Sequence, residues 1–112
     1  MITVQHMRGP SRGVTTERIP EHIALFIVMN GGVDVIECDL ALRLWRFRHK
    51  HGRGMTIQEV RNSIKGRIPA ECDDVTAHTA KLISNISRMG LEVTTTTIRT
   101  RPQGKPRVEF SV

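Results

Sequence analysis

The stretch VTAHTAKLISNISRMGLEVTTTTIRTRPQGKPRVEFSV, residues 75–112, decides the predicted fold. Its first part predicts a helix over residues 75–89, which Gly90 ends. The threonine-rich residues 91–100 predict a strand, because β-branched side chains favour extended structure. A short turn with prolines, glycine and basic residues at 101–106 leads into a second predicted strand at 107–112. The C-terminal third is therefore predicted to be a helix followed by a two-stranded hairpin with a basic tip.

The predicted helix 75–89 has two dissimilar faces. Val75, Leu82, Ile86 and Met89 form an apolar stripe that is expected to face the core. The opposite face carries small, hydroxyl and basic side chains but no carboxylate: Ala77, Ala80, Lys81, Ser84, Ser87 and Arg88. Thr76 and Asn85 flank this face and add a hydroxyl and an amide. Small residues let a helix approach a DNA groove, and the polar groups can bind base edges or phosphates. An ordinary solvated helix is the alternative, although such helices usually mix glutamate with lysine.

Two more helices are predicted upstream, each with a capping-box pattern at its start. Asp34 and Glu37 have this spacing at the start of residues 34–51, and Thr56 and Glu59 have it at the start of residues 56–65. Gly66 is predicted to end the second of these helices. Asp73 or Asp74 is expected to cap the helix at 75–89.

The predicted helix 34–51 carries two apolar stripes. The first consists of Ile36, Leu40, Leu44 and Phe47, and the second of Leu42, Trp45 and His49. A helix with two such stripes usually packs between two partners. One partner is the domain core, and the other is the segment from Ile23 to Met29 or a second copy of the chain. A homodimer through Leu42, Trp45 and that segment is therefore one predicted partnership.

The N-terminal part is predicted to contain two different segments. Residues 1–19 have three arginines and little periodicity, which favours a flexible basic arm. The domain is expected to span residues 20–112 and to begin with an apolar extension at 20–33. Within it, residues 20–29 suit a helix or a buried strand, since periodicity cannot separate the two in a run that is apolar throughout. Pro20 followed by Glu21 slightly favours the helix.

Composition favours a small, basic, single-domain protein. The chain has 112 residues, a net charge of +6 and two cysteines, so a disulfide-stapled secreted domain is disfavoured. There is no secretory signal pattern, and the longest apolar run is too short to span a bilayer, which predicts a cytoplasmic location without membrane contact. The absence of tyrosine and the 4% aromatic content disfavour a single-strand binder built on stacked rings. Two basic runs contain no acid, residues 43–53 and residues 99–107.

No arrangement of residues indicates an enzyme. The histidines and the two cysteines match no usual zinc spacing, and the sequence has neither a glycine-rich phosphate loop nor a nucleophile elbow. Cys72 beside Asp73 and Asp74 is poorly placed for a reactive thiolate. No metal and no cofactor are predicted.

Residues 37–112 resemble the winged helix-turn-helix transcription regulators, and within them the small enterobacterial activators of the CaiF/GrlA type. Three stretches carry the resemblance: Leu40-Ala41-Leu42-Arg43-Leu44-Trp45, then Met55-Thr56-Ile57-Gln58-Glu59-Val60, then the basic hairpin. The resemblance implies an α+β fold with a three-helix core and a C-terminal two-stranded wing, and promoter binding, often as a dimer. The turn from Gly66 to Asp73 departs from the family's tight turn, which has about three to four residues.

Double-stranded DNA is therefore the predicted partner, with the helix 75–89 in the major groove and the hairpin 99–107 as the wing. The predicted DNA-binding residues on the helix are Thr76, Ala77, Lys81, Ser84, Asn85 and Arg88. Those on the wing are Arg99, Arg101, Lys105 and Arg107. Two alternatives stay open, a winged-helix module that binds a protein and a basic protein that binds RNA by its shape.

Overall fold

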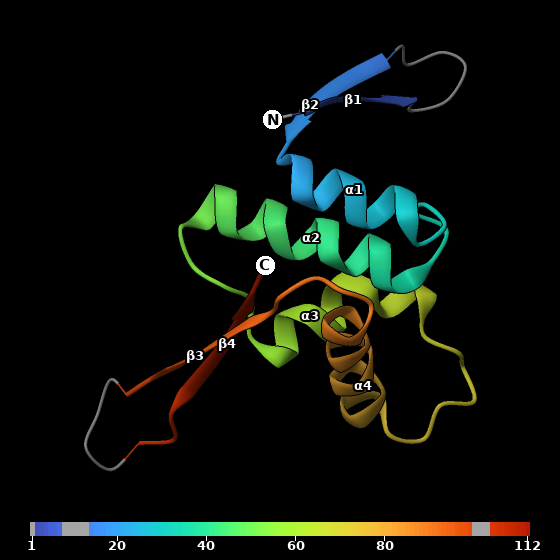
Figure 1. The fold of residues 1–112 in the computed structure, drawn as a ribbon. Coiled ribbons are helices and arrows are strands. Elements are labelled where there is room, and N and C mark those ends of the chain that lie inside the picture. Colours follow the sequence, from blue (N-terminus) through green and yellow to red (C-terminus); the bar gives the residue numbers. More distant parts are fainter. Residues whose placement is uncertain (1, 8–13, 100–103) are drawn as a thin grey trace.

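The computed structural model describes the backbone of residues 2–7, 14–99 and 104–112, and the side chains of residues 18–99 and 104–112. Within these ranges the fold is α+β, with helices followed by a C-terminal antiparallel hairpin, as predicted (Figure 1). In chain order the elements are β1 (Ile2–Met7), β2 (Val14–Ile19), α1 (Glu21–Met29), α2 (Ile36–His51), α3 (Ile57–Ile64), the 3-10 helix η1 (Lys65–Arg67), α4 (Val75–Arg88), β3 (Thr94–Ile98) and β4 (Arg107–Ser111).

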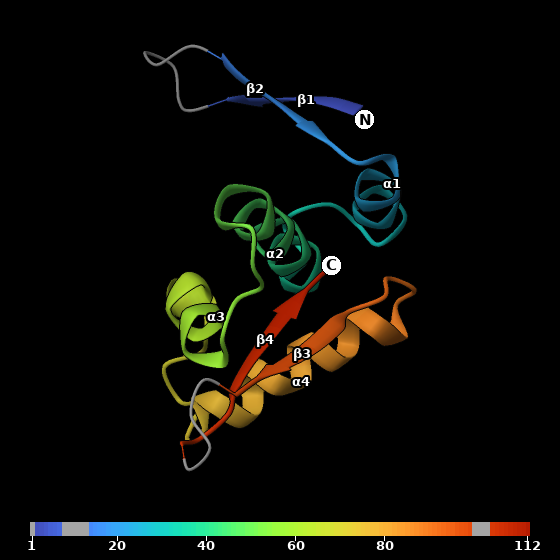
Figure 2. The ribbon, with the colours of Figure 1, turned by 90° about the vertical axis from the view of Figure 1, so that its left-hand side faces the viewer.

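Helix α2 is the centre of the arrangement, because it packs against α1, α3, α4 and β4. Helix α1 lies along one flank of α2, whereas α3 and α4 lie beneath it (Figures 1 and 2). The two hairpins project from opposite ends of the molecule. The β1–β2 hairpin lies beyond α1, and the β3–β4 hairpin lies beside α4 (Figures 1 and 2).

The core lies where α2, α3 and α4 meet. Leu40 and Leu44 of α2, Val60 and Ile64 of α3 and Ile86 of α4 are all at most 1% exposed. The prediction of two apolar stripes on α2 holds at their centres. Leu40, Leu44, Leu42 and Trp45 are buried, whereas Ile36 and Phe47 are half-buried and His49 is exposed.

The apolar extension forms helix α1 and not a strand. It begins after Pro20, whose carbonyl accepts hydrogen bonds from the amides of Ile23 and Ala24, and Asn30 is its C-cap. Ile23, Ala24, Phe26 and Ile27 are buried, and α1 packs on α2, so the segment supplies one of the two partners predicted for that helix. No helix in the described part of the chain is both long enough and apolar enough to cross a membrane.

Helix α2 begins two residues later than predicted. Its N-cap is Val35, with no side-chain cap, so the capping box expected at Asp34 and Glu37 is wrong. The carbonyl of Asp34 accepts a hydrogen bond from Nη2 of Arg67 instead, and the Val35 carbonyl accepts the amides of Cys38 and Asp39. Asp34 therefore lies outside the helix, and its carbonyl contacts an arginine that is distant in the sequence. The C-terminal end is as predicted, because Gly52 adopts a left-handed φ of 71° there.

The start of helix α3 is as predicted. Thr56 and Glu59 form a complete capping box. The Thr56 side chain accepts the backbone amide of Glu59, and the Glu59 side chain accepts the backbone amide of Thr56. The end differs, because α3 stops at Ile64 and Gly66 lies inside the 3-10 helix η1. Residues 68–73 then form the turn that leads to α4, which Asp74 caps.

The C-terminal hairpin is anchored through β4. Antiparallel pairing joins Thr95 to Phe110, and an isolated bridge joins Phe110 to Met55 in the segment between α2 and α3. The bridge has two backbone hydrogen bonds, of 2.9 and 2.8 Å. It fixes the base of the hairpin to the helical core, while all five residues of β3 are exposed.

The N-terminal segment contains a second hairpin. Strands β1 and β2 pair antiparallel from Ile2 with Ile19 to Met7 with Val14. The sequence predicts a flexible basic arm over residues 1–19, and the structure contains these two strands within that segment. Ile19 explains the attachment, since it is only 3% exposed and belongs to the core.

Candidate nucleic-acid interface

Helix α4 presents an outer face without a carboxylate. Its exposed residues are Thr76, Ala77, Ala80, Lys81, Ser84, Ser87 and Arg88. No aspartate or glutamate occurs between Val75 and Arg88. Lys81 and Arg88 are about two helical turns apart on this face, and neither forms an ion pair with any described residue. Two unneutralised cations therefore stand among small and hydroxyl side chains.

The inner face of α4 holds the helix in place. Leu82 and Ile86 are buried as predicted, and Ile83 is buried with them, whereas Val75 and Met89 are half-buried. Thr79 is fully buried, and its hydroxyl donates to the carbonyl of Val75 at 2.7 Å, so it needs no other partner. At the N-terminus the Asp74 carboxylate accepts the Ala77 amide at 2.9 Å.

Asn85 does not belong to the outer face. It is half-buried, and its Nδ2 donates to Oε2 of Glu37 at 3.0 Å. The sequence predicts a DNA-facing role for Asn85, but the structure turns its amide toward α2. The hydrogen bond joins the C-terminal half of α4 to the first turn of α2 and helps to set the direction of α4.

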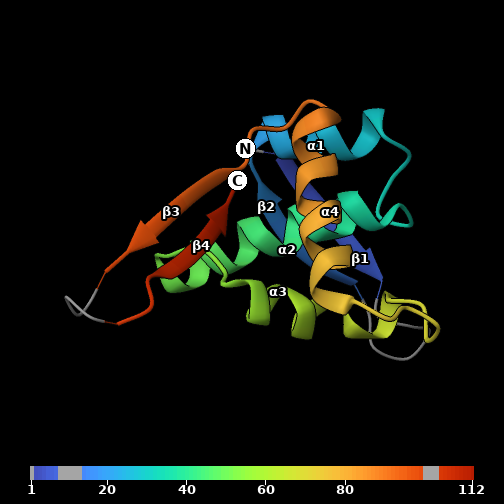
Figure 3. The ribbon, with the colours of Figure 1, turned by 90° about the horizontal axis from the view of Figure 1, so that it is seen from below.

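The β3–β4 hairpin lies on the same side of the molecule as α4. In the view from below, α4 is nearest the reader and the hairpin extends beside it (Figure 3). Arg99 and Lys105 are exposed near the tip of this hairpin. Arg101, also predicted to act in the wing, lies outside the described residues.

Arg107 belongs to a cluster of alternating charges at the base of the hairpin. Its Nε is 2.8 Å from Oε2 of Glu109, and its Nη2 is 3.9 Å from Oε1 of Glu59. Arg53 binds both oxygens of Glu59, at 2.8 and 2.9 Å, and its guanidinium lies 4.7 Å from the centre of the Phe47 ring. Glu109 is only 4% exposed, although it carries a carboxylate. The cluster joins β4 to the start of α3.

Glu59 is the most strongly perturbed acid of this cluster. Hydrogen bonds from Arg53, helped by those from Thr56, outweigh the effect of burial and lower the pKa of Glu59 to about 2. The carboxylate is therefore ionised at neutral pH. Arg107, a predicted wing residue, has one side of its guanidinium engaged in this cluster and 44% of its side chain exposed.

Part of the basic run on α2 also stabilises the fold. Arg43 contacts Asp39 at 2.9 Å and donates to the Ser63 carbonyl at 2.7 Å. Arg67 contacts the other oxygen of Asp39 at 2.9 Å. Burial raises the pKa of Asp39, but hydrogen bonds from Arg43 and Arg67 outweigh it and lower that pKa overall. These arginines join α2 to α3 and η1.

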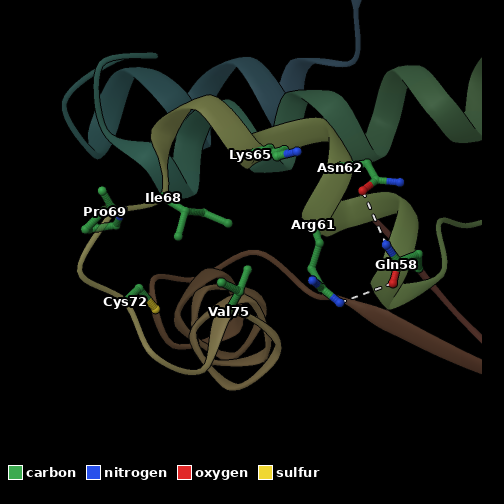
Figure 4. A pocket seen from close by; sticks show the side chains of 9 residues that line it. Gln58, Arg61, Asn62, Lys65, Ile68, Pro69, Cys72 and Val75 are labelled. Carbon is green, nitrogen blue, oxygen red and sulfur yellow. Dashed lines mark hydrogen bonds between the residues drawn. The ribbon is translucent and has the colours of Figure 1, made fainter.

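A cavity of about 400 Å³ opens between α3 and the turn that precedes α4. Figure 4 shows its walls, with Arg61 reaching down from α3, Ile68, Pro69 and Cys72 on the turn, and Val75 at the start of α4. Sequence reasoning missed this feature. The signal that could have indicated it is the length of the turn, which leaves room between two helices that a tighter turn would bring together.

Neither metal ligation nor thiol chemistry stands out in the described residues. No three histidine, cysteine, aspartate or glutamate side chains gather there in a group that could hold a metal ion. Cys38 is fully buried, and burial raises the pKa of its thiol. Cys72 is partly exposed, and both cysteines are free.

Comparison of the chain with protein-family models found no matching family, and comparison with curated proteins and with solved structures found no match in either.

Proposed function

We propose that this chain is a winged helix-turn-helix regulator of transcription that binds double-stranded DNA. Helix α4 would occupy the major groove, and the β3–β4 hairpin would be the wing beside it. The observed order of helices and hairpin is consistent with this topology. The observation that carries the proposal is the outer face of α4, which is exposed and free of carboxylates along the whole helix.

This face has the chemistry that a DNA groove requires. Ala77 and Ala80 are small enough to let the helix backbone approach the bases closely. Thr76, Ser84 and the two cations Lys81 and Arg88 can bond base edges or phosphates. A carboxylate on this face would repel the phosphate backbone, and none is present between Val75 and Arg88.

The hairpin supports the same function through charge. Arg99 and Lys105 are exposed on the side of the molecule that presents α4, and we propose that they bind phosphates together with Arg101. Arg107 has a divided role, since it also pairs with Glu109. Such contacts hold a protein on the duplex without reading its sequence.

A gel-shift experiment with a random duplex library at low salt tests the proposal. The unmodified chain should bind and should lose affinity steeply as salt rises, because each phosphate contact releases counterions. Lys81→Ala combined with Arg88→Ala should abolish the shift while the circular dichroism spectrum stays native, since both side chains are exposed. Absence of any shift by the unmodified chain would refute DNA binding.

A matched control separates this reading from a general effect of charge. Arg18→Ala combined with Lys50→Ala also removes two positive charges. These two residues line a cavity beside Trp45, and no residue of α4 lines that cavity. DNA binding through α4 requires this control to shift DNA nearly as well as the unmodified chain. Equal losses in both double variants would indicate non-specific attraction to a polyanion.

A protein-binding role is the second candidate, because α1 leaves an apolar face uncovered. Val28 and Met29 are 76% and 80% exposed, and Leu25 is 48% exposed. Leu42 and Trp45, which the sequence predicts in a homodimer contact, are buried within the chain itself. We therefore narrow the proposed contact to α1. If two copies associate through α1, the mass of the protein in solution should be that of a dimer. Val28→Lys should then reduce this mass to that of a monomer.

A further inference from the structure

We propose that the cavity between α3 and the turn preceding α4 binds a small organic anion, meaning a carboxylate or phosphate ester with a short apolar body. Its volume of about 400 Å³ is within the range of small-molecule sites. The lining comes from α3, η1, the turn and the first residue of α4: Gln58, Arg61, Asn62, Lys65, Ile68, Pro69, Ala70, Cys72 and Val75. Two members of this set are cationic and none is acidic.

Arg61 is the observation that points to an anion. Its Nη1 donates to Oε1 of Gln58 at 3.2 Å, but its Nε is buried and has no hydrogen-bond partner. Among the described residues it is the one buried side-chain nitrogen or oxygen atom in this condition. The guanidinium forms no ion pair with any described acid, so a carboxylate or phosphate oxygen in the cavity would supply a charged acceptor for its remaining N–H groups.

None of the described acidic residues near the cavity forms an ion pair with Arg61. Glu71 and Asp73 are on the same turn, but both are exposed and neither lines the cavity. Asp74 is engaged in capping α4. Lys65 lines the cavity from η1 and is exposed, so it can add a second positive charge at the rim.

The opposite wall determines the rest of the ligand. Ile68, Pro69 and Val75 are apolar, and in Figure 4 all three lie to the left of Arg61. A bare phosphate of a DNA backbone would satisfy Arg61 but would leave this wall uncovered. An anion with a short apolar body matches both walls, which favours a free small molecule over a DNA phosphate.

The position of the cavity connects it to α4. A ligand held by Arg61 of α3 and by Val75 would bridge α3 and the N-terminus of α4. It would therefore restrain the turn that sets the tilt of α4. By restraining α4, the ligand would change the affinity for DNA. That change rests on the proposed function, whereas anion binding itself does not.

Protection of Cys72 measures binding without DNA. Cys72 lines the cavity and is partly exposed, whereas Cys38 is fully buried, so iodoacetamide reports on Cys72. The probes are benzoate, benzyl alcohol as its uncharged counterpart, and inorganic phosphate, which has no apolar body. Benzoate should slow the alkylation in a saturable manner and at lower concentration than either of the other two.

Two variants and one control test the contacts. Arg61→Gln should weaken benzoate protection about tenfold or more, as expected for the loss of a charge-assisted hydrogen bond. Lys65→Gln changes an exposed residue, so it keeps the test valid if Arg61→Gln fails to fold. We expect it to weaken protection by a smaller factor. Lys81→Gln, on the outer face of α4, should leave benzoate protection unchanged while it weakens DNA binding.

The results separate the two proposals. The anion site is overturned if benzoate protects no better than benzyl alcohol, or if folded Arg61→Gln is protected as well as the unmodified chain. Protection by duplex DNA but not by benzoate also overturns it, because the cavity would then receive a backbone phosphate. Benzoate protection without any DNA shift would uphold the anion site and refute the proposed function.

Discussion

Gly54 lies directly against the backbone of Phe110, and a Cβ atom at position 54 would come within 2.6 Å of the Phe110 carbonyl oxygen. This approach allows the neighbouring residue Met55 to bridge to Phe110. Gly54→Ala should therefore lower the free energy of unfolding by about 1 to 3 kcal/mol, because backbone and not a flexible side chain blocks the added methyl group. Chemical denaturation measures the loss.

Gly66 offers a matched control for that substitution. A Cβ atom at Gly66 would meet nothing within 4 Å, and Gly66 does not have a positive φ. Gly66→Ala should leave stability unchanged or raise it by up to about 1 kcal/mol, since alanine restricts the unfolded chain. An equal loss in both variants would show that packing against Phe110 is not the cause.

The charge cluster at Glu59 should make stability depend on acidity. The pKa of Glu59 falls from its ordinary 4.5 to about 2, so its contribution is complete above pH 4.5 and is lost as the pH falls toward 2. Glu59→Gln keeps a residue that suits the capping box but removes the charge. The variant should lose about 1 kcal/mol near neutral pH and show a shallower decline in acid. Urea denaturation across this pH range checks both, and an unchanged decline would contradict the assignment.

The hydrogen bond between Asn85 and Glu37 should contribute to stability rather than to DNA contact. Asn85→Ala should lower the free energy of unfolding by about 1 to 2 kcal/mol, because it removes an amide bonded to a carboxylate. Ser84→Ala, at an exposed neighbour, should stay within about 0.5 kcal/mol of the unmodified chain. In a double-mutant cycle with Glu37→Ala, purely additive losses would mean that the two side chains do not interact.

Substitutions in the wing should change how DNA binding depends on salt. Lys105→Ala should reduce affinity on all sequences alike and lower the slope of log K against log salt by about one, as expected for one phosphate contact. Arg101→Ala with Lys105→Ala should extend the same trend. Filter binding at several salt concentrations, with two unrelated duplexes, measures it. A change in sequence preference would instead indicate that the wing contacts bases.

Features that depend on residues close together in the chain were predictable from the sequence. The capping box of Thr56 and Glu59 requires contacts over three residues only, and so does the cap of α4, for which the sequence offered Asp73 or Asp74. The outer face of α4 was also predictable, because helical periodicity determines it once Leu82 and Ile86 are inside.

Features that depend on contacts between residues distant in the sequence were not predictable. Asp34 lies outside α2, where its carbonyl accepts a hydrogen bond from Arg67, 33 residues away, and the Asn85 amide donates to Glu37, 48 residues away. Glu109 is buried in a strand whose alternation assigns the core side to Val108 and Phe110. Its carboxylate pairs with Arg107, and its Oε2 lies 4.0 Å from Nη1 of Arg53. No local sequence pattern predicts the contact with Arg53.

The exposed strand β3 makes one side of the hairpin an open edge. Strand β4 is paired on both sides, with β3 on one and Met55 on the other, whereas in the described residues β3 is paired only with β4. The outer backbone groups of Thr94 to Ile98 can therefore accept a strand from another molecule. The positive charges of Arg99 and Lys105 near the adjoining tip oppose such pairing between two copies of the chain. Replacing those cations to test DNA binding would therefore also increase the tendency of the chain to form intermolecular sheets.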